Sequence, residues 1–317
     1  MGFLQNTSET LDQQVQPDKN LESMKGVTEF HKITRIAVVG AGLMGHGIAQ
    51  VAAQFGKYEV NLCDVNQELL NNALGLIGES LSKFSRSGKI ARKEMKIILK
   101  RIHPTFNLEE AIADTDLIIE AIDENKKSKM ELLSAISCHA NERTIIATNT
   151  SSIPITELAS AVQKPENFCG FHFFNPPQLI ELVEIIRGDR TSNETVQMVL
   201  EVAHKMERES VLVKKDCPGF IVNRILMPAL NEAANLYFSG VAGREDIDKA
   251  IRVGLKWPMG PLMLIDQIGV DTVVAVSEIL EKKFGSGFSP HSGLGNMVRV
   301  GDLGRKSGKG FYDWDAK

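Results

Sequence analysis

Short apolar runs alternate with longer amphipathic segments through the first half of the chain. Each run is nearly continuous, the pattern of a strand buried on both faces of a parallel sheet; the runs are residues 36–39, 60–63, 117–119 and 144–147. Helices are predicted between them over residues 42–55, 66–85 and 130–136. In the second helix, six apolar residues are spaced for one face: Leu69, Leu70, Ala73, Leu76, Ile77 and Leu81. This alternation predicts a doubly wound α/β domain with right-handed crossovers.

The pattern changes after Asn149. Residues 168–174 and 182–186 are predicted as two strands joined by the Pro176-Pro177 turn, and residues 210–213 as a third strand. From Pro218 onward the apolar spacing is helical, with helices predicted over residues 220–237, 244–255 and 261–284. We therefore expect three parts: a disordered polar leader (1–31), an α/β domain (32–215) and an all-helical C-terminal domain (216–317).

The composition is that of an ordinary globular protein, with 43% hydrophobic and 24% charged residues among 317. The formal charge of −4 lacks the basic balance of a nucleic-acid binder. The four cysteines form no CxxC pair and the histidines show no metal-ligand spacing, so no metal site is expected, and Cys169 and Cys217 are expected to be small buried residues. The sequence contains neither a membrane-spanning apolar stretch nor a recognisable targeting signal, and a cytoplasmic location follows by elimination.

A glycine-rich turn follows the first predicted strand and opens the first predicted helix. It has the pattern GxGxxG, formed by Gly40, Gly42, Leu43, Met44 and Gly45 around Ala41. Asp64 follows the second strand, where an acid can accept hydrogen bonds from an adenosine ribose. The helix N-terminus supplies amide donors and partial positive charge to a pyrophosphate. These features predict a Rossmann-type NAD site, and the absence of an arginine directly after Asp64 disfavours NADP. The alternative is a tight turn without a cofactor.

A histidine and a glutamate are predicted to meet across the second-half hairpin. If its turn is centred on Gln178, His172 and Glu184 lie directly opposite each other on neighbouring strands. A carboxylate at that position fixes the imidazole tautomer and stabilises the imidazolium, as a general base requires. The alternative is a structural histidine beside a surface glutamate.

The order of these motifs closely resembles the 3-hydroxyacyl-CoA dehydrogenase family. The resemblance comprises the glycine fingerprint, Asn-Thr-Ser-Ser at 149–152, His-Phe-Phe-Asn-Pro from His172, Glu184, and Pro-Gly-Phe-Ile-Val-Asn-Arg at 218–224. It extends from about residue 33 to Gly-Lys-Gly-Phe-Tyr at 308–312, which leaves out little besides the leader.

The resemblance implies roles for individual residues. His172 corresponds to the base that takes the proton of a substrate 3-hydroxyl, and Glu184 to the carboxylate that orients it. Ser151 corresponds to the serine that hydrogen-bonds the reacting oxygen and contacts both NAD and acyl-CoA, and Asn223 to an asparagine that completes the pocket. Residues that match further NAD contacts of the family are Glu124, Lys129, Asn175 and Lys306. Taken alone, each of these four is an exposed polar residue on a solvated surface.

A basic stretch follows the second strand–helix unit. It contains a single acid, Glu94, among eight cations: Lys83, Arg86, Lys89, Arg92, Lys93, Lys96, Lys100 and Arg101. Such a patch can capture the phosphates of coenzyme A, and the resemblance places acyl-CoA contacts at Ser80 and at a cation just beyond it. Because Ser87 stands where the family has a lysine, Arg86 or Lys89 is the expected substitute. The alternative is a solvated helical face; nucleic-acid binding is disfavoured because Phe84 is the only interleaved aromatic.

These observations and the resemblance predict NAD-dependent oxidation of (S)-3-hydroxyacyl-CoA to 3-oxoacyl-CoA, with a short substrate such as 3-hydroxybutyryl-CoA and a place in fatty acid β-oxidation. Two alternatives stay open. One is a relative that acts on a sugar acid such as L-gulonate, and the other is a non-catalytic structural relative that retains NAD binding. Apolar helices of the C-terminal part suggest a homodimer, as in family members.

Overall fold

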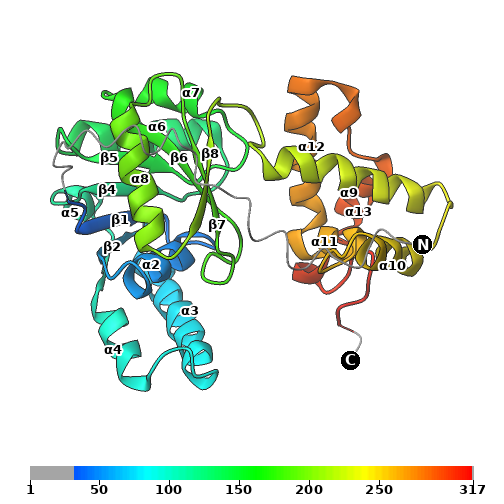
Figure 1. The fold of residues 1–317 in the computed structure, drawn as a ribbon, viewed down its shortest axis with the longest axis horizontal. Coiled ribbons are helices and arrows are strands. Elements are labelled where there is room, and N and C mark those ends of the chain that lie inside the picture. Colours follow the sequence, from blue (N-terminus) through cyan, green and yellow to red (C-terminus); the bar gives the residue numbers. More distant parts are fainter. Residues whose placement is uncertain (1–31, 316–317) are drawn as a thin grey trace, which may run out of the picture. The chain divides into compact units, whose positions relative to one another are not determined.

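The fold is described by a computed structural model that covers residues 32–315. The leader predicted over residues 1–31 lies outside the described residues. The described residues form one eight-stranded sheet with its helices, followed by a set of helices (Figure 1). Among the described residues, no helix is both long and apolar enough to cross a membrane.

The sheet has the strand order β3-β2-β1-β4-β5-β6-β7-β8. Its strands are β1 (Arg35–Val39), β2 (Glu59–Cys63), β3 (Ile102–Thr105), β4 (Leu117–Glu120), β5 (Ile145–Thr148), β6 (Phe168–Phe173), β7 (Leu182–Ile186) and β8 (Glu209–Val213). The first six strands run parallel, β7 is antiparallel to β6, and β8 is parallel to β7. The order reverses between β1 and β4, which makes the carboxyl ends of these strands the place where a doubly wound sheet binds a ligand.

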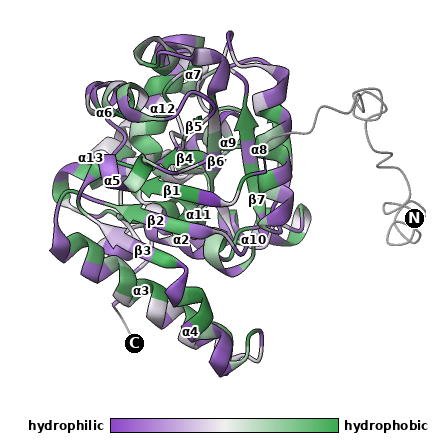
Figure 2. Ribbon diagram, turned by 90° about the vertical axis from the view of Figure 1, so that its left-hand side faces the viewer, coloured by the Kyte–Doolittle hydropathy of each residue, from purple (hydrophilic) through white to green (hydrophobic). Residues whose placement is uncertain are grey.

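Helices cover both faces of the sheet. They are α2 (Gly45–Gln54), α3 (Gln67–Arg86), α4 (Arg92–Lys100), α5 (Leu108–Ile112), α6 (Lys126–His139), α7 (Ile155–Leu158) and α8 (Asn193–Lys205), with the 3-10 turns η1 (Ala159–Ala161) and η2 (Pro165–Asn167). Helices α5, α6 and α7 share a buried apolar cluster with Val39 and Ile118 of the sheet. Helix α2 faces Val38, on the other side of the pleat. Figure 2 shows the central strands β1 and β2 as largely hydrophobic ribbon.

The C-terminal part is helical and has a core of its own. Its elements are α9 (Val222–Phe238), α10 (Arg244–Gly254), α11 (Pro261–Ile268), α12 (Val270–Phe284), η3 (Ser286–Phe288), α13 (Ser292–Val300) and η4 (Arg305–Ser307). Buried residues of α9, α11 and α12, such as Leu230, Ile265 and Val273, form its apolar cluster. The single helix predicted over residues 261–284 is wrong, because Gly269 has a φ of 106° and separates α11 from α12.

Several elements escaped the sequence pattern. The pattern did not indicate β3, because this edge strand carries His103 and Pro104 in place of an apolar run. Helices α4, α5, α8 and α13 were also missed. In α3, Leu70, Ala73, Ile77 and Leu81 are buried as predicted, but Leu69 and Leu76 are exposed.

Two cysteines test the prediction of small buried residues. Cys169 is buried in β6, and burial raises the pKa of its thiol to about 12. Cys217 is only half-buried, so the prediction is wrong for this residue.

Candidate active site

The glycine loop after β1 is shaped by the absence of side chains. Gly40 has a φ of 105°, and a Cβ at this position would lie 2.6 Å from the carbonyl oxygen of Ala121. A Cβ on Gly45 would lie 1.6 Å from the carbonyl oxygen of Gly40. The first turn of α2 can therefore approach the strand this closely only with glycine at position 45. Gly42 is different: it is exposed, and a Cβ there would meet nothing within 4 Å. The loop therefore leaves open space at the amide-rich start of α2, as a bound pyrophosphate requires.

Asp64 joins the end of β2 to this loop. Its Oδ2 accepts a hydrogen bond from the Ala41 amide at 2.5 Å, and its Oδ1 accepts one from the Val65 amide at 2.6 Å. Carboxylate oxygens have lone pairs left for further donors. The loop, the helix start and this half-buried acid therefore fit a dinucleotide with an unphosphorylated adenosine ribose.

Glu124 is enclosed by the loop that follows β5. Its Oε1 accepts five hydrogen bonds, from the hydroxyls of Thr150, Ser151 and Ser152 and from the amides of Ser151 and Ser152, at 2.7–3.3 Å. Burial alone raises the pKa of Glu124, but the Lys129 ammonium and the bonds from the loop outweigh it and hold the pKa below its usual range. The carboxylate thus stays charged while its side chain is 35% exposed.

Beneath Glu124 lies a buried ion pair that the sequence did not indicate. Lys129 of α6 is 1% exposed, and its Nζ donates to Glu120 Oε1 at 2.6 Å and to the Ile122 carbonyl at 3.1 Å. Glu120 is fully buried at the end of β4, where it also accepts from the Ile122 amide and the Thr148 hydroxyl. Lys129 Nζ lies 3.6 Å from Glu124 Oε2. The solvated-surface alternative is therefore wrong for Lys129, which binds the end of β4 and the loop that follows it.

His172 and Glu184 meet as the hairpin prediction requires. They are register partners across β6 and β7, and His172 Nδ1 lies 2.8 Å from Glu184 Oε2. Both side chains are buried, at 5% and 0% exposure. The other carboxylate oxygen, Oε1, accepts from the amides of Ile221 and Val222, 3.0 Å away at the start of α9. Glu184 therefore fixes the imidazole through Nδ1, which leaves Nε2 as the nitrogen that can exchange a proton.

The remaining predicted residues occupy separate positions. Asn223 is half-buried in the first turn of α9, directly after the Val222 amide that Glu184 binds. Asn175 is exposed at the end of β6 and precedes a cis peptide bond to Pro176. Lys306, in η4, is paired with Asp271 at 2.6 Å. Among the described residues, no group of side chains has the makings of a metal site.

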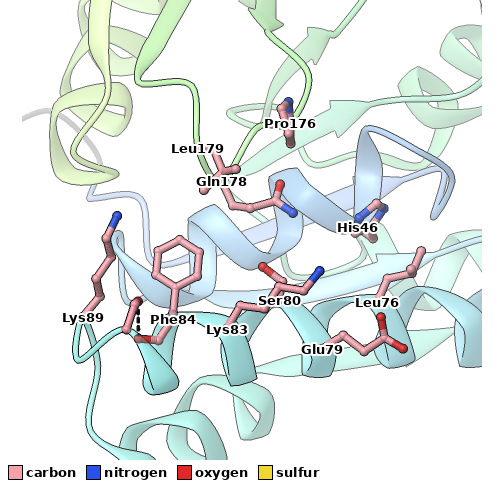
Figure 3. A pocket seen from close by; sticks show the side chains of 11 residues that line it. His46, Leu76, Glu79, Ser80, Lys83, Phe84, Lys89, Pro176, Gln178 and Leu179 are labelled. Atoms are coloured by element: carbon pink, nitrogen blue, oxygen red, sulfur yellow. Dashed lines mark hydrogen bonds between the residues drawn. The ribbon is translucent and has the colours of Figure 1, made fainter. Parts of the chain in front are cut away.

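A pocket of about 500 Å³ lies between α3 and the turn that joins β6 to β7 (Figure 3). Its lining residues are His46, Leu76, Glu79, Ser80, Lys83, Phe84, Ser87, Lys89, Pro176, Gln178 and Leu179. Of the residues predicted to contact coenzyme A, Ser80 and Lys89 line this pocket, whereas Arg86 and Ser151 do not. The sequence did not indicate His46 or Gln178 as pocket residues. Lys83 belongs to the basic stretch, but nothing in the sequence distinguishes it from the other cations there.

Comparisons with known proteins agree with this architecture. The family profile described as "3-hydroxyacyl-CoA dehydrogenase, NAD binding domain" matches residues 35–217, and the profile of the C-terminal domain of the same family matches residues 219–314. A probable 3-hydroxybutyryl-CoA dehydrogenase of Deinococcus radiodurans is 46% identical over 281 residues, which are 88% of this chain and 100% of that protein.

Solved structures give the same result. The structure of M. tuberculosis FadB2 has a TM-score of 0.87 and 35% identity, with 89% of this chain and 99% of that chain covered. The (S)-3-hydroxybutyryl-CoA dehydrogenase of Ralstonia eutropha has a TM-score of 0.85 and 37% identity, at the same coverage. The chain therefore belongs to the 3-hydroxyacyl-CoA dehydrogenase family.

Proposed function

We propose that this protein oxidises a short (S)-3-hydroxyacyl-CoA to the 3-oxoacyl-CoA with NAD, and that it also catalyses the reverse reaction. The observation that carries the proposal is the buried His172–Glu184 pair, with Nδ1 and Oε2 2.8 Å apart at the carboxyl edge of the sheet. Membership of the 3-hydroxyacyl-CoA dehydrogenase family supports the same chemistry.

The proton steps follow from the geometry of this pair. With Nδ1–H donated to Glu184, His172 Nε2 accepts the proton of the substrate 3-hydroxyl as the C3–H bond breaks. The carboxylate then stabilises the imidazolium that forms. When bound, NAD supplies the acceptor for the hydride from C3. In the reverse direction His172 returns the proton to the carbonyl oxygen.

We assign the other residues by position. The 40–45 loop and Asp64 would hold the pyrophosphate and the adenosine ribose of NAD. Glu124, kept ionised by Lys129 and the 150–152 loop, would stand with Ser151 on the nicotinamide side. Asn175, Asn223 and Lys306 complete the set as proposed contacts.

The acyl-CoA substrate accounts for the pocket on α3. Lys83 and Lys89 line it together with Ser80, so phosphates of coenzyme A would meet two ammonium groups there. A sugar acid such as L-gulonate has a single carboxylate and lacks both the phosphates and the long arm that a basic pocket of this size would hold, and neither alternative from the sequence is favoured. The boundary between the two domains at residues 215–216, the homodimer and the cytoplasmic location stay predictions.

The proposal is tested by NADH consumption with 3-oxoacyl-CoA thioesters of increasing chain length, beginning with acetoacetyl-CoA, beside NAD reduction with L-gulonate. We expect turnover with the thioesters and a kcat/KM highest at the short end. Turnover of L-gulonate without turnover of any thioester would overturn the proposal.

A further inference from the structure

The turn between β6 and β7 is held by an arginine that has no place in the chemistry. Arg208 is buried after α8, and its guanidinium donates to the carbonyls of Met206, Pro177 and Ile180 at 3.1–3.3 Å. It also lies over the ring of Phe55, 4.7 Å from the centroid. Because a guanidinium has a rigid fork of donors, the bonds to Pro177 and Ile180 tie this irregular segment to the start of β8.

Gln178 is the polar residue that this turn contributes to the pocket. Its Oε1 is buried without a hydrogen-bond partner. The turn packs against the bare backbone of α2: a Cβ on Gly47 would lie 2.7 Å from Gln178 Oε1 and 2.9 Å from Pro177 Cδ. With Oε1 packed against Gly47, the Nε2 end of the amide is the side-chain donor that the turn offers to the pocket above α3 (Figure 3).

The surroundings of this amide indicate what it binds. Leu76, Phe84 and Leu179 give the pocket apolar walls. Its charged lining residues are Lys83, Lys89 and one acid, Glu79, so the balance is positive. A donor placed on such a wall selects a ligand that offers an acceptor, since an unmatched donor is costly once the pocket is filled. The pantetheine arm of coenzyme A runs from the phosphates to the thioester, and its apolar carbons are interrupted by two amide groups and one hydroxyl. Of these, the amide carbonyls are the stronger acceptors.

We propose that Gln178 Nε2 donates a hydrogen bond to an amide carbonyl of the pantetheine arm, and that Arg208 is a positioning residue that holds Gln178 in place. This inference rests on the proposed function, because it takes an acyl-CoA as the ligand of the pocket. Gln178 thereby selects thioesters of pantetheine over thioesters without an amide.

The test compares Gln178→Leu and Gln178→Glu with the wild type on three substrates: acetoacetyl-CoA, acetoacetyl-pantetheine and the amide-free S-propyl acetothioacetate. Leucine keeps the volume and removes the buried unpaired oxygen, so the fold is preserved. We expect KM to rise about tenfold for both pantetheine substrates with kcat unchanged, because the bond forms equally in the ground and transition states. For the amide-free thioester kcat/KM should not change. Gln178→Glu should raise KM for the pantetheine substrates further than Gln178→Leu does, because a carboxylate cannot donate and its charge also repels the carbonyl oxygen.

The outcomes separate this inference from the proposed function. If the wild type turns over acetoacetyl-CoA but Gln178→Leu changes its KM by less than about twofold, the role of Gln178 is refuted while the function stands. Equal losses on all three substrates, or tighter binding by Gln178→Glu, refute it as well. If the wild type turns over no thioester, the proposed function is refuted. The role of Gln178 is then tested separately, by calorimetric titration of the wild type and Gln178→Leu with pantetheine. Equal dissociation constants for the two proteins would refute the hydrogen bond.

Arg208 is tested by the conservative variant Arg208→Lys, which keeps the charge and loses the fork. KM for the pantetheine substrates should rise with kcat unchanged, and the double variant with Gln178→Leu should be no worse than Gln178→Leu alone. Additive effects would show that Arg208 acts independently of Gln178 and would overturn its positioning role.

Discussion

Two regions at the same edge of the sheet are built in opposite ways. The loop after β1 presents backbone atoms in place of side chains. No Cβ fits at Gly40 or Gly45, and the space beside Gly42 is open. The region after β4, β5 and β6 is made of buried charged side chains, Glu120 with Lys129 and Glu184 with His172. In the proposed function, the first region binds the pyrophosphate through backbone amides, which carry no net charge to be compensated. The second region must compensate every charge that folding removes from water.

The difference lies in what each region tolerates. A backbone site fails when a side chain is added where no Cβ fits or where a ligand must approach. A charge site fails when one partner is removed, because the other is left buried and unpaired. The following changes test this contrast, from the largest expected effect to the smallest.

The largest effect is expected from His172→Gln in the charge region. Glutamine can still bond to Glu184 but cannot take up a proton, so we expect turnover of acetoacetyl-CoA to fall about a thousandfold. The dissociation constant of NADH, measured by its fluorescence, should stay within about twofold of the wild type, because the proposed nucleotide contacts lie elsewhere. Undiminished turnover would refute the assignment of His172 as the general base.

Lys129→Met should strongly destabilise the fold, because it leaves Glu120 buried without its partner. We expect the free energy of unfolding to drop by about 3 kcal/mol in urea titrations, and the double variant Glu120→Gln/Lys129→Met to recover most of it. Lys127→Met is the matched control, since Lys127 is exposed on the same helix. Equal stability of the Lys127 and Lys129 variants would contradict the buried pair.

Gly45→Ala and Gly42→Ala form a matched pair in the backbone region. The added Cβ at Gly45 clashes with the Gly40 carbonyl, so unfolding should become easier by about 2 kcal/mol. At Gly42 the Cβ meets no protein atom, and stability should stay unchanged while NADH binding weakens about tenfold. Wild-type stability of Gly45→Ala, or wild-type NADH affinity of Gly42→Ala, would contradict the role proposed for the backbone of this loop.

The smallest effect concerns the pH dependence of stability. The pKa of Glu124 is lowered in the folded protein by Lys129 and the 150–152 loop, which outweigh burial. Its ionised form therefore contributes stability above about pH 4.5, and this contribution disappears as the pH falls through the lowered folded pKa. The stability difference between the wild type and Glu124→Gln should shrink between pH 7 and pH 3 in denaturant titrations. A difference that grows on acidification would show that the pKa is raised instead.

The two regions were also unequally visible in the sequence. The glycine loop follows from spacing within six residues, and the His172–Glu184 register follows from a short hairpin, so both could be predicted. The Glu120–Lys129 pair could not be recognised in this way, because it joins a strand end to the next helix and sits in a lysine-rich stretch. A signal existed: Lys129 shares its helical face with Leu133 and Ile136, which are buried.

The pocket on α3 shows the same limit. Composition indicated a basic patch, but only the fold selects Lys83 and Lys89 from it and adds Gln178 from the turn beyond β6. Such a site depends on which loop the sheet order brings beside α3. The exposed position of Leu76, which periodicity placed in the core, has its explanation here because Leu76 lines the pocket.

Glu184 has a consequence beyond orienting an imidazole. Its carboxylate links two elements of the structure. Oε2 accepts a hydrogen bond from His172 on β6, and Oε1 accepts from the amides of Ile221 and Val222 at the start of α9. A displacement of the first turn of α9 would move the Glu184 carboxylate away from Nδ1, and the imidazole would lose the acceptor that fixes its orientation and its tautomer. The proton transfer proposed for His172 therefore depends on the position of the first turn of α9, through a single carboxylate.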